Sequence, residues 1–338
     1  MIRQYRARPK TLQSDSIDRS ATTGLLLVNL GTPDAPTSPA VRRYLAEFLA
    51  DPRVIEIPPF LWKLILHGII LRVRPKKSAA LYQSVWQDEG SPLLVISRQQ
   101  QAALQQELGD NVRVKLGMRY GNPSIAGALR EFQDEGIERI IIFPLYPQYA
   151  APTTGTVFDA VARELMTWRR VPALTFIDGY FDNSFYLAAL SNSIREHIDQ
   201  HGVPQKIIFS YHGMPKRNYD LGDPYYDFCT RTTALVAEQL GLDADICLST
   251  FQSRFGYAEW LQPYTDKTLE SLPASGIKNI AILSPAFSAD CLETLEELAV
   301  ENREIFMHAG GESYHYIPAL NDRADHIHAL AEVVKQSL

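Results

Sequence analysis

The chain has 338 residues, of which 46% are hydrophobic and 21% are charged, and its formal net charge at pH 7 is −6. This composition is typical of a globular protein with room for about two domains, and it argues against a disordered or fibrous chain. The acidic balance disfavours nucleic acid as a partner, because nucleic-acid binding requires a concentrated basic surface.

The cysteines and the N-terminus indicate where the protein works. Cys229, Cys247 and Cys291 are too few and too scattered for a disulfide framework, so we expect a reducing compartment. Residues 1–23 are polar and lack the apolar core of a secretory signal, which predicts a flexible tail and a cytoplasmic protein. The longest apolar stretch, residues 60–73, is interrupted by Lys, His and Arg and is shorter than a membrane-spanning helix requires.

Strand-like apolar runs alternate with helix-like segments along the chain, which predicts an α/β fold with mainly parallel sheet. The helices carry the expected end signals, with Asp223-Pro224 before one of them and Gly202 and Gly241 after two of them. In chain order, the clearest elements are a strand at 24–30, a helix at 98–108, a strand at 139–143, a helix at 185–200, a strand at 206–211, a helix at 225–240, a strand at 279–284 and a helix at about 323–336.

The two halves of the chain repeat one another in order, which predicts an internal duplication. The matching pairs are LLLVNLGTP at 25–33 with IIFSYHGMP at 207–215, RYG at 119–121 with RFG at 254–256, and GIERI at 136–140 with GIKNI at 276–280. We therefore expect two similar Rossmann-like, doubly wound domains that face each other across a cleft. The first spans 24–180 and carries an insertion at about 35–90, and the second spans 181–338 and includes the C-terminal helix.

The sequence lacks the motifs of several common enzymes built on such a scaffold. It has no G-x-G-x-x-G after the first strand, no G-x-x-x-x-G-K-[ST], no H-E-x-x-H and no G-x-S-x-G. A dehydrogenase is therefore disfavoured.

One histidine lies where doubly wound folds bind their ligands, beyond the carboxyl end of a strand. His212 directly follows the predicted strand 206–211. An imidazole at this place can accept a proton or ligate a borderline metal ion, although a lone histidine is often a satisfied structural group. Its position alone leaves both interpretations open.

Carboxylates follow the predicted strand 279–284 in the second half. Asp290 and Glu293 are three positions apart, so they share one face if a helix has begun there. The acids that come next fit a solvated first turn favoured by the helix dipole: Glu296, Glu297 and Glu301. Because the duplication places both strand ends on one cleft, we expect His212 and Glu293 to converge.

Six colinear motifs, spread over nearly the whole chain, resemble the ferrochelatase family. They are NLGTP at 29–33, DEGSPL at 88–93, YPQY at 146–149 with TTG at 153–155, SYHGMP at 210–215 with YDLGDPY at 219–225, FQS at 251–253 and PAFSAD at 285–290. The resemblance implies two Rossmann-like domains around a central porphyrin cleft. It also implies a lyase that inserts ferrous iron into protoporphyrin IX at the last step of haem synthesis.

The resemblance assigns roles to particular residues. His212 and Glu293 would flank the metal-insertion site as catalytic residues and iron ligands, and Asp290 would help to relay protons or guide the cation. Whether His212 meets the protons or the metal stays open. The apolar lip over the macrocycle would include Phe60, Leu61, Trp62, Ile65 and Leu66. The other residues implied to bind porphyrin are Arg74, Ser91, Arg119, Tyr120, Trp260 and Phe287.

The sequence departs from the family pattern at Cys291, where many relatives have histidine. No cysteine follows it, so we expect no iron–sulfur cluster and no permanently bound cofactor, with Fe²⁺ acting as substrate. The basic residues at 72–77 favour the two propionates of protoporphyrin over substrates with more carboxylates. A chelatase for coproporphyrin or sirohydrochlorin remains an alternative, as does a two-lobed tetrapyrrole-binding protein without catalysis. Peripheral contact with the inner face of the membrane, or with an upstream haem-pathway enzyme, is left open.

Overall fold

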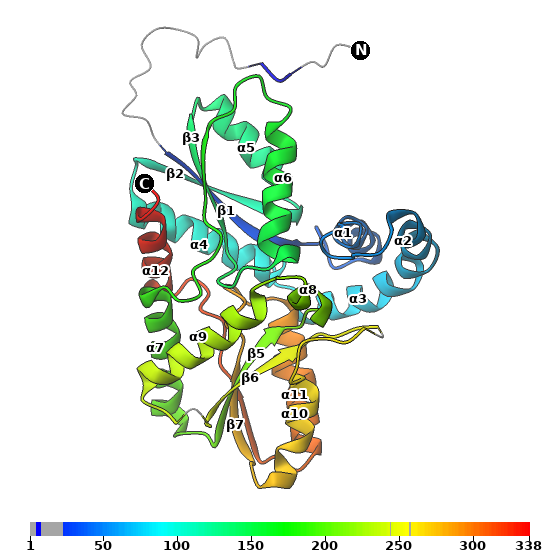
Figure 1. Cartoon of the computed structure of the whole chain (residues 1–338), viewed down its shortest axis with the longest axis vertical. Helices are drawn as coiled ribbons and strands as arrows, with labels where there is room; N and C mark the ends of the chain where they lie inside the picture. Colours follow the sequence, from blue (N-terminus) through cyan, green and yellow to red (C-terminus); the bar gives the residue numbers. More distant parts are fainter. Residues whose placement is uncertain (1–4, 8–22, 244, 257) are drawn as a thin grey trace. The chain divides into compact units, whose positions relative to one another are not determined.

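The computed structural model describes residues 5–7, 23–243, 245–256 and 258–338, and the chain divides into two compact units (Figure 1). The first unit contains the described residues up to Leu145 together with Ala151–Gly179 and Leu330–Leu338. The second contains Tyr146–Ala150 and Tyr180–Ala329. Each unit has one parallel four-stranded sheet flanked by helices.

The sheet of the first unit has the strand order β2-β1-β3-β4. Its strands are β1 (Thr23–Thr32), β2 (Val112–Gly121), β3 (Arg139–Pro144) and β4 (Ala173–Phe176), and all neighbours are parallel. The apolar run Leu25–Val28 is completely buried, as expected for a central strand covered on both faces. The helices are α1 (Ser38–Leu49), α2 (Pro59–Ile65), η2 (Leu66–Ile70), α3 (Leu71–Val85), α4 (Pro92–Leu108), α5 (Ile125–Asp134), η3 (Ala151–Gly155) and α6 (Thr156–Leu165).

The sheet of the second unit repeats this arrangement with the order β6-β5-β7-β8. Its strands are β5 (Lys206–His212), β6 (Cys247–Gln252), β7 (Asn279–Leu283) and β8 (Ser313–Tyr316). The helices are α7 (Ser184–His201), α8 (Lys216–Asp220), α9 (Tyr225–Leu240), α10 (Thr265–Ser271), η4 (Pro273–Ser275), η5 (Glu293–Glu301) and α11 (Asn302–His308). The last helix, α12 (Ala324–Lys335), begins in the second unit, and its residues from Leu330 onward belong to the first. The equivalent strand orders confirm the predicted fold class of two similar doubly wound parallel-sheet units.

The first unit carries a helical insertion between β1 and β2, made of α1, α2, η2 and α3. It has its own small core, in which Leu49, Ile55, Leu66 and Leu71 are buried together. Within the part of the chain that the structure describes, no helix combines the length and the apolar character needed to cross a membrane.

Only a few residues of the predicted N-terminal tail are described, namely 5–7 and Thr23. Arg6 forms a backbone bridge with Trp168, and its guanidinium pairs with the Asp134 carboxylate at 2.9 Å. The rest of the predicted tail lies outside the described residues.

Candidate active site in the second unit

His212 is the last residue of β5, and its register partner on β6 is Gln252. Its Nδ1 lies 2.8 Å from the carbonyl oxygen of Gly213. Because a carbonyl oxygen can only accept a hydrogen bond, Nδ1 carries a proton, and in the neutral ring Nε2 is the nitrogen with a free lone pair. The half-buried ring lies 6.4 Å from the ring of Phe287, centroid to centroid. His212 is therefore oriented with one nitrogen able to accept a proton or bind a metal.

The glycine after His212 allows two strand ends to approach closely. The Gly213 amide donates to the carbonyl oxygen of Gln252 at 2.7 Å, and a Cβ at position 213 would lie 2.5 Å from that oxygen. The same Cβ would lie 3.1 Å from the indole ring of Trp260. A side chain at 213 would therefore displace His212 from its place beside β6.

A π-helix, η5, begins at Glu293 and continues to Glu301, whereas Asp290 lies in the loop before it. The side-chain amide of Gln252 donates to the Glu293 carbonyl oxygen and to the Glu297 carboxylate, at 3.2 Å in each case. Since Gln252 pairs with His212, it connects the end of β5 to the first turn of the π-helix. π-Helical turns occur frequently at functional sites.

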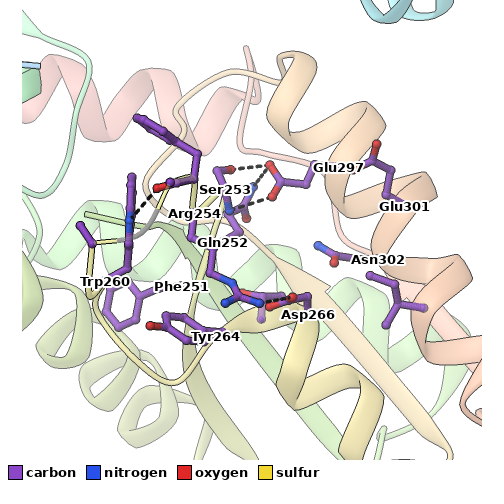
Figure 2. Close-up of a pocket in the computed structure, with 15 residues that line it drawn as sticks. Phe251, Gln252, Ser253, Arg254, Trp260, Tyr264, Asp266, Glu297, Glu301 and Asn302 are labelled. Atoms are coloured by element: carbon purple, nitrogen blue, oxygen red, sulfur yellow. Dashed lines mark hydrogen bonds and ion pairs between the residues drawn. The ribbon is translucent and has the colours of Figure 1, made fainter. Parts of the chain in front are cut away.

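Glu297 is a functional candidate that the sequence did not predict, and the expectation of a solvated side chain is wrong for this residue. Its carboxylate accepts hydrogen bonds from the Ser253 amide, at 2.8 Å, and from the Ser253 hydroxyl (Figure 2). Burial raises the pKa of Glu297, against opposing contributions from Ser253, His212 and Gln252, while the charge of Glu293 raises it further. Glu297 therefore lies within electrostatic range of both His212 and Glu293.

A cavity of about 470 Å³ lies beside Glu297 (Figure 2). Arg254 at its wall pairs with Asp266 at 2.8 Å and lies 4.3 Å above the ring of Tyr264. Other wall residues are Trp260, Glu301 and Asn302. Within the described residues, no group of three or more His, Cys, Asp or Glu side chains is arranged to hold a metal ion.

Two predicted pocket residues of this unit have different surroundings. Trp260 lines the cavity, is almost fully buried, and donates its indole N–H to the Phe255 carbonyl oxygen at 3.0 Å. Asp290 is buried and accepts hydrogen bonds from Thr294, Tyr316 and Asn321. Its predicted part in relaying protons stays a prediction.

The predicted porphyrin-binding residues Ser91, Arg119 and Tyr120 belong to the first unit, where all three are buried. The Arg119 guanidinium pairs with the Asp51 carboxylate, and the exposed fractions of these side chains are 6% and 5%. The Tyr120 hydroxyl donates to the same carboxylate at 3.1 Å, and burial raises the pKa of this tyrosine. The Ser91 hydroxyl caps α4 by accepting from the Leu94 amide.

The predicted lip also belongs to the first unit, and its residues divide between surface and interior. Phe60 is 82% exposed and Leu61 is 52% exposed, whereas Leu66 is buried. Trp62 is half-buried, and its indole N–H donates to the Leu49 carbonyl oxygen at 2.6 Å. Other exposed residues of this region are Ile57, Leu64, Ile69, Val73 and Arg74. Ile65 is half-buried. Phe60 and Leu61 are therefore the predicted lip residues whose side chains are exposed to a ligand.

The fold is similar to those of two solved structures. The structure of SirB from Bacillus subtilis with Fe³⁺ aligns with a TM-score of 0.54 at 12% identity, covering 94% of this chain and 95% of that one. The structure of CbiX, described as the terminal enzyme for biosynthesis of sirohaem in denitrifying bacteria, aligns with a TM-score of 0.51 at 13% identity, covering 93% and 99%. At this identity the likeness shows the fold alone.

Sequence similarity identifies the family within this fold. The ferrochelatase family model matches residues 22–338. Ferrochelatase 2 of Shewanella oneidensis is 63% identical over 318 residues, covering 93% of this chain and 97% of that protein. The ferrochelatase of Shewanella denitrificans is 58% identical over 330 residues, covering 94% and 98%. The chain belongs to the ferrochelatase family.

Proposed function

We propose that this chain inserts ferrous iron into protoporphyrin IX to give protohaem, the last step of haem synthesis. The observation that carries the proposal is the match to the ferrochelatase family across residues 22–338, because this family inserts iron into protoporphyrin in haem synthesis. The grouping of His212, Glu293 and Glu297 supports it with suitable chemistry.

The reaction replaces two pyrrole N–H protons with one dication, so the protein must accept protons and present a partly dehydrated ion. His212 offers the lone pair of Nε2 for the first proton, because Nδ1 is already engaged with Gly213. The carboxylates of Glu293 and Glu297 accept the second proton and pass it to water. Because its pKa is raised, Glu297 is a better proton acceptor than an ordinary carboxylate. Such general-base assistance typically accelerates a reaction about 10²–10⁴-fold.

The iron reaches the porphyrin along the π-helix. Glu293, Glu297 and Glu301 are spaced by four residues on η5, and the last two line the cavity beside β6. Carboxylate oxygens exchange readily with the water of a hydrated ferrous ion, and imidazole suits the same borderline ion. The lone pair of His212 serves either the first proton or, as a transient ligand, the ion.

The porphyrin is gripped by apolar and basic side chains. Phe287 and Trp260 supply ring surface near His212, and Phe60, Leu61 and Trp62 supply the lip. Of the first-unit residues that the family resemblance assigns to porphyrin binding, Arg74 is exposed and suits pairing with a propionate, whereas Ser91, Arg119 and Tyr120 are buried within that unit. This grip bends the macrocycle, and strain of this kind typically amounts to ~1–5 kcal/mol drawn from binding of the rest of the ligand.

The protein works without a resident cofactor. Cys229, Cys247 and Cys291 lie on α9, on β6 and in the loop before η5, and we propose no iron–sulfur cluster. The exposed apolar residues of α2, flanked by Lys63, Arg72 and Arg74, suit reversible contact with the inner face of an anionic membrane from the cytoplasm. The same surface suits delivery of porphyrin from an upstream enzyme of the haem pathway.

An anaerobic absorbance assay tests the function directly. Purified protein is mixed with ferrous iron and, in parallel, with protoporphyrin IX, coproporphyrin or sirohydrochlorin. We expect stoichiometric consumption of iron with protoporphyrin and a faster rate than with the other two. Fastest turnover of another substrate would reassign the chelatase, and porphyrin binding without iron consumption would make the protein a carrier.

A further inference from the structure

The loop between β7 and η5 carries two parts of the proposed site. It holds Phe287 beside the His212 ring, and it ends where Glu293 begins the π-helix. The hydrogen bonds that its own backbone makes locally include Phe287 N–H to the Ser284 oxygen at 3.2 Å. The position of this loop, residues 284–292, therefore also depends on side chains outside it.

One of these outside contacts is a reciprocal pair of hydrogen bonds between Asp290 and Asn321. The Asp290 amide donates to the Asn321 side-chain oxygen at 2.8 Å, and the Asn321 side-chain amide donates to Oδ2 of Asp290 at 2.7 Å. The Asn321 backbone amide adds a third bond, to the Ser288 oxygen at 3.0 Å. We call this pair the Asp290–Asn321 clamp.

The other carboxylate oxygen of Asp290 is also occupied. Oδ1 accepts hydrogen bonds from the hydroxyls of Thr294 and Tyr316 and from the Ala319 amide. Thr294 belongs to the π-helix and Tyr316 to β8, so Asp290 connects its own loop to both of these elements. Every one of these partners donates a hydrogen bond to the carboxylate, so the Asp290 side chain is fixed in position.

Asn321 itself is held by a buried histidine. His326 is 0% exposed, and its Nδ1 lies 2.7 Å from the Asn321 carbonyl oxygen, so the imidazole N–H donates to it. The backbone of Asn321 has a φ of +50°, a left-handed conformation that asparagine tolerates better than most residues. The hydrogen bond from His326 holds the Asn321 carbonyl group in place. This backbone conformation directs the side-chain amide of Asn321 toward Asp290.

We propose that Asn321 is a positioning residue for metal insertion: seated by His326, it clamps Asp290 and so sets where Phe287 and Glu293 stand. The inference rests on the proposed function and assigns Asp290 to the same positioning task in place of a proton relay. Asn321 touches neither porphyrin nor iron. Misplacement of a reacting group by about 1 Å is enough to lower a rate ~10²-fold.

An exchange of the two side chains separates positioning from proton relay. The substitution Asp290→Asn places two amides opposite each other, and Asn321→Asp places two carboxylates opposite each other. In the double variant Asp290→Asn/Asn321→Asp, the side-chain amide at position 290 donates to the carboxylate at position 321. That carboxylate still accepts from the backbone amide of residue 290. The side-chain oxygen at position 290 can still accept from Thr294, Tyr316 and the Ala319 amide. The clamp is restored with its charge moved to position 321.

We expect each single variant to lose about 10²-fold in kcat for iron insertion while the KM for porphyrin changes little, and the double variant to recover to within about tenfold of wild type. The pH profile of the double variant should match that of wild type. A double variant as slow as Asp290→Asn alone would overturn the proposal, because Asp290 would then be needed as a carboxylate in its own place.

Two controls distinguish a local effect from general destabilisation. Asn183 caps α7 by accepting from the amides of Phe185 and Tyr186, so Asn183→Ala should lower stability without changing kcat. At position 326, His326→Asn keeps a donor near the Asn321 oxygen and should retain more activity than His326→Leu. Equal activity of these two variants would contradict the role of His326.

Hydrogen exchange separates failure of this inference from failure of the proposed function. Asn321→Gly suits the left-handed backbone and removes the amide, so amides of residues 287–301 should exchange faster than in wild type. Unchanged exchange overturns the clamp whatever the activity. A wild-type protein that inserts no iron defeats the proposed function instead, and the exchange measurement then still decides whether the clamp exists.

Discussion

The buried imidazole of His326 predicts a specific loss of stability at acidic pH. Burial lowers the pKa of His326 from its ordinary value of 6.5 to about 4, although the hydrogen bond to Asn321 and the nearby Asp325 carboxylate act in the opposite direction. The unfolded chain therefore binds a proton at His326 more readily than the folded chain does. The contribution of His326 to the free energy of unfolding is fully present above pH 6.5 and is lost as the pH falls from about 6.5 to about 4.

The magnitude follows from the size of the pKa shift. A shift from 6.5 to about 4, at 1.36 kcal/mol for each unit, corresponds to about 3 kcal/mol once the pH is below both values. Between pH 7 and pH 4.5 most of this difference, about 2 kcal/mol, is lost. His326→Leu removes the titrating group, so the free energy of unfolding of this variant should fall by about 2 kcal/mol less than that of wild type over the same interval.

Urea unfolding at pH 7 and pH 4.5, followed by circular dichroism, measures this difference. Other titrating groups, including His197, whose pKa is also lowered by burial to about 4, are present in both proteins and cancel in the comparison. At pH 7 the variant should be about 1 kcal/mol less stable, because it lacks the hydrogen bond to Asn321. An equal loss of stability on acidification in both proteins would refute this reasoning.

Three further substitutions test other parts of the structure. Asp51→Asn leaves the buried Arg119 guanidinium without its counter-charge and should lower the free energy of unfolding by about 3–5 kcal/mol, and a loss below ~1 kcal/mol in urea titrations would show that the pair is dispensable. Glu297→Gln should slow iron insertion by about 10²-fold or more with an unchanged porphyrin Kd, whereas a wild-type rate would leave Glu297 a structural residue. Phe60→Asp should change stability by less than ~0.5 kcal/mol, because the side chain is exposed, and should raise the Kd for protoporphyrin; fluorescence titration showing an unchanged Kd would exclude Phe60 from the lip.

The strands that could be recognised from the sequence are the central ones. The clear predictions at 24–30, 139–143, 206–211 and 279–284 correspond to β1, β3, β5 and β7, which lie inside their sheets. Strands covered on both faces appear in the sequence as continuous apolar runs. The edge strands β2, β4, β6 and β8 contain exposed or polar positions, so their apolar signal is weaker.

Helix ends were predictable where a local signal marks them. The helix expected at 225–240 matches α9, which ends at the left-handed Gly241. The helix expected at 98–108 begins earlier, at Pro92, where the Ser91 hydroxyl caps it. Proline at the first position is a start signal that outweighs the less regular apolar pattern of residues 92–97.

The positions of His212 and Glu293 after their strands could be predicted, whereas the setting of Glu297 could not. Its burial depends on Ser253 and Gln252, which are far away in the chain, and on a π-helical turn that changes the usual helical spacing. The same holds for Arg119, whose partner Asp51 lies in the insertion. A sequence read locally reports which groups can titrate, and only the fold reports which of them are paired.

The rate of a single turnover by Glu293→Gln tests the central claim most directly. Protein saturated with protoporphyrin IX is mixed with ferrous iron in an anaerobic stopped-flow instrument, and porphyrin affinity is measured separately by fluorescence. We predict a porphyrin Kd close to that of wild type and insertion slower by about 10²-fold or more, with His212→Ala nearly inactive. Insertion at the wild-type rate in either variant would contradict the assignment of these two side chains to the reaction.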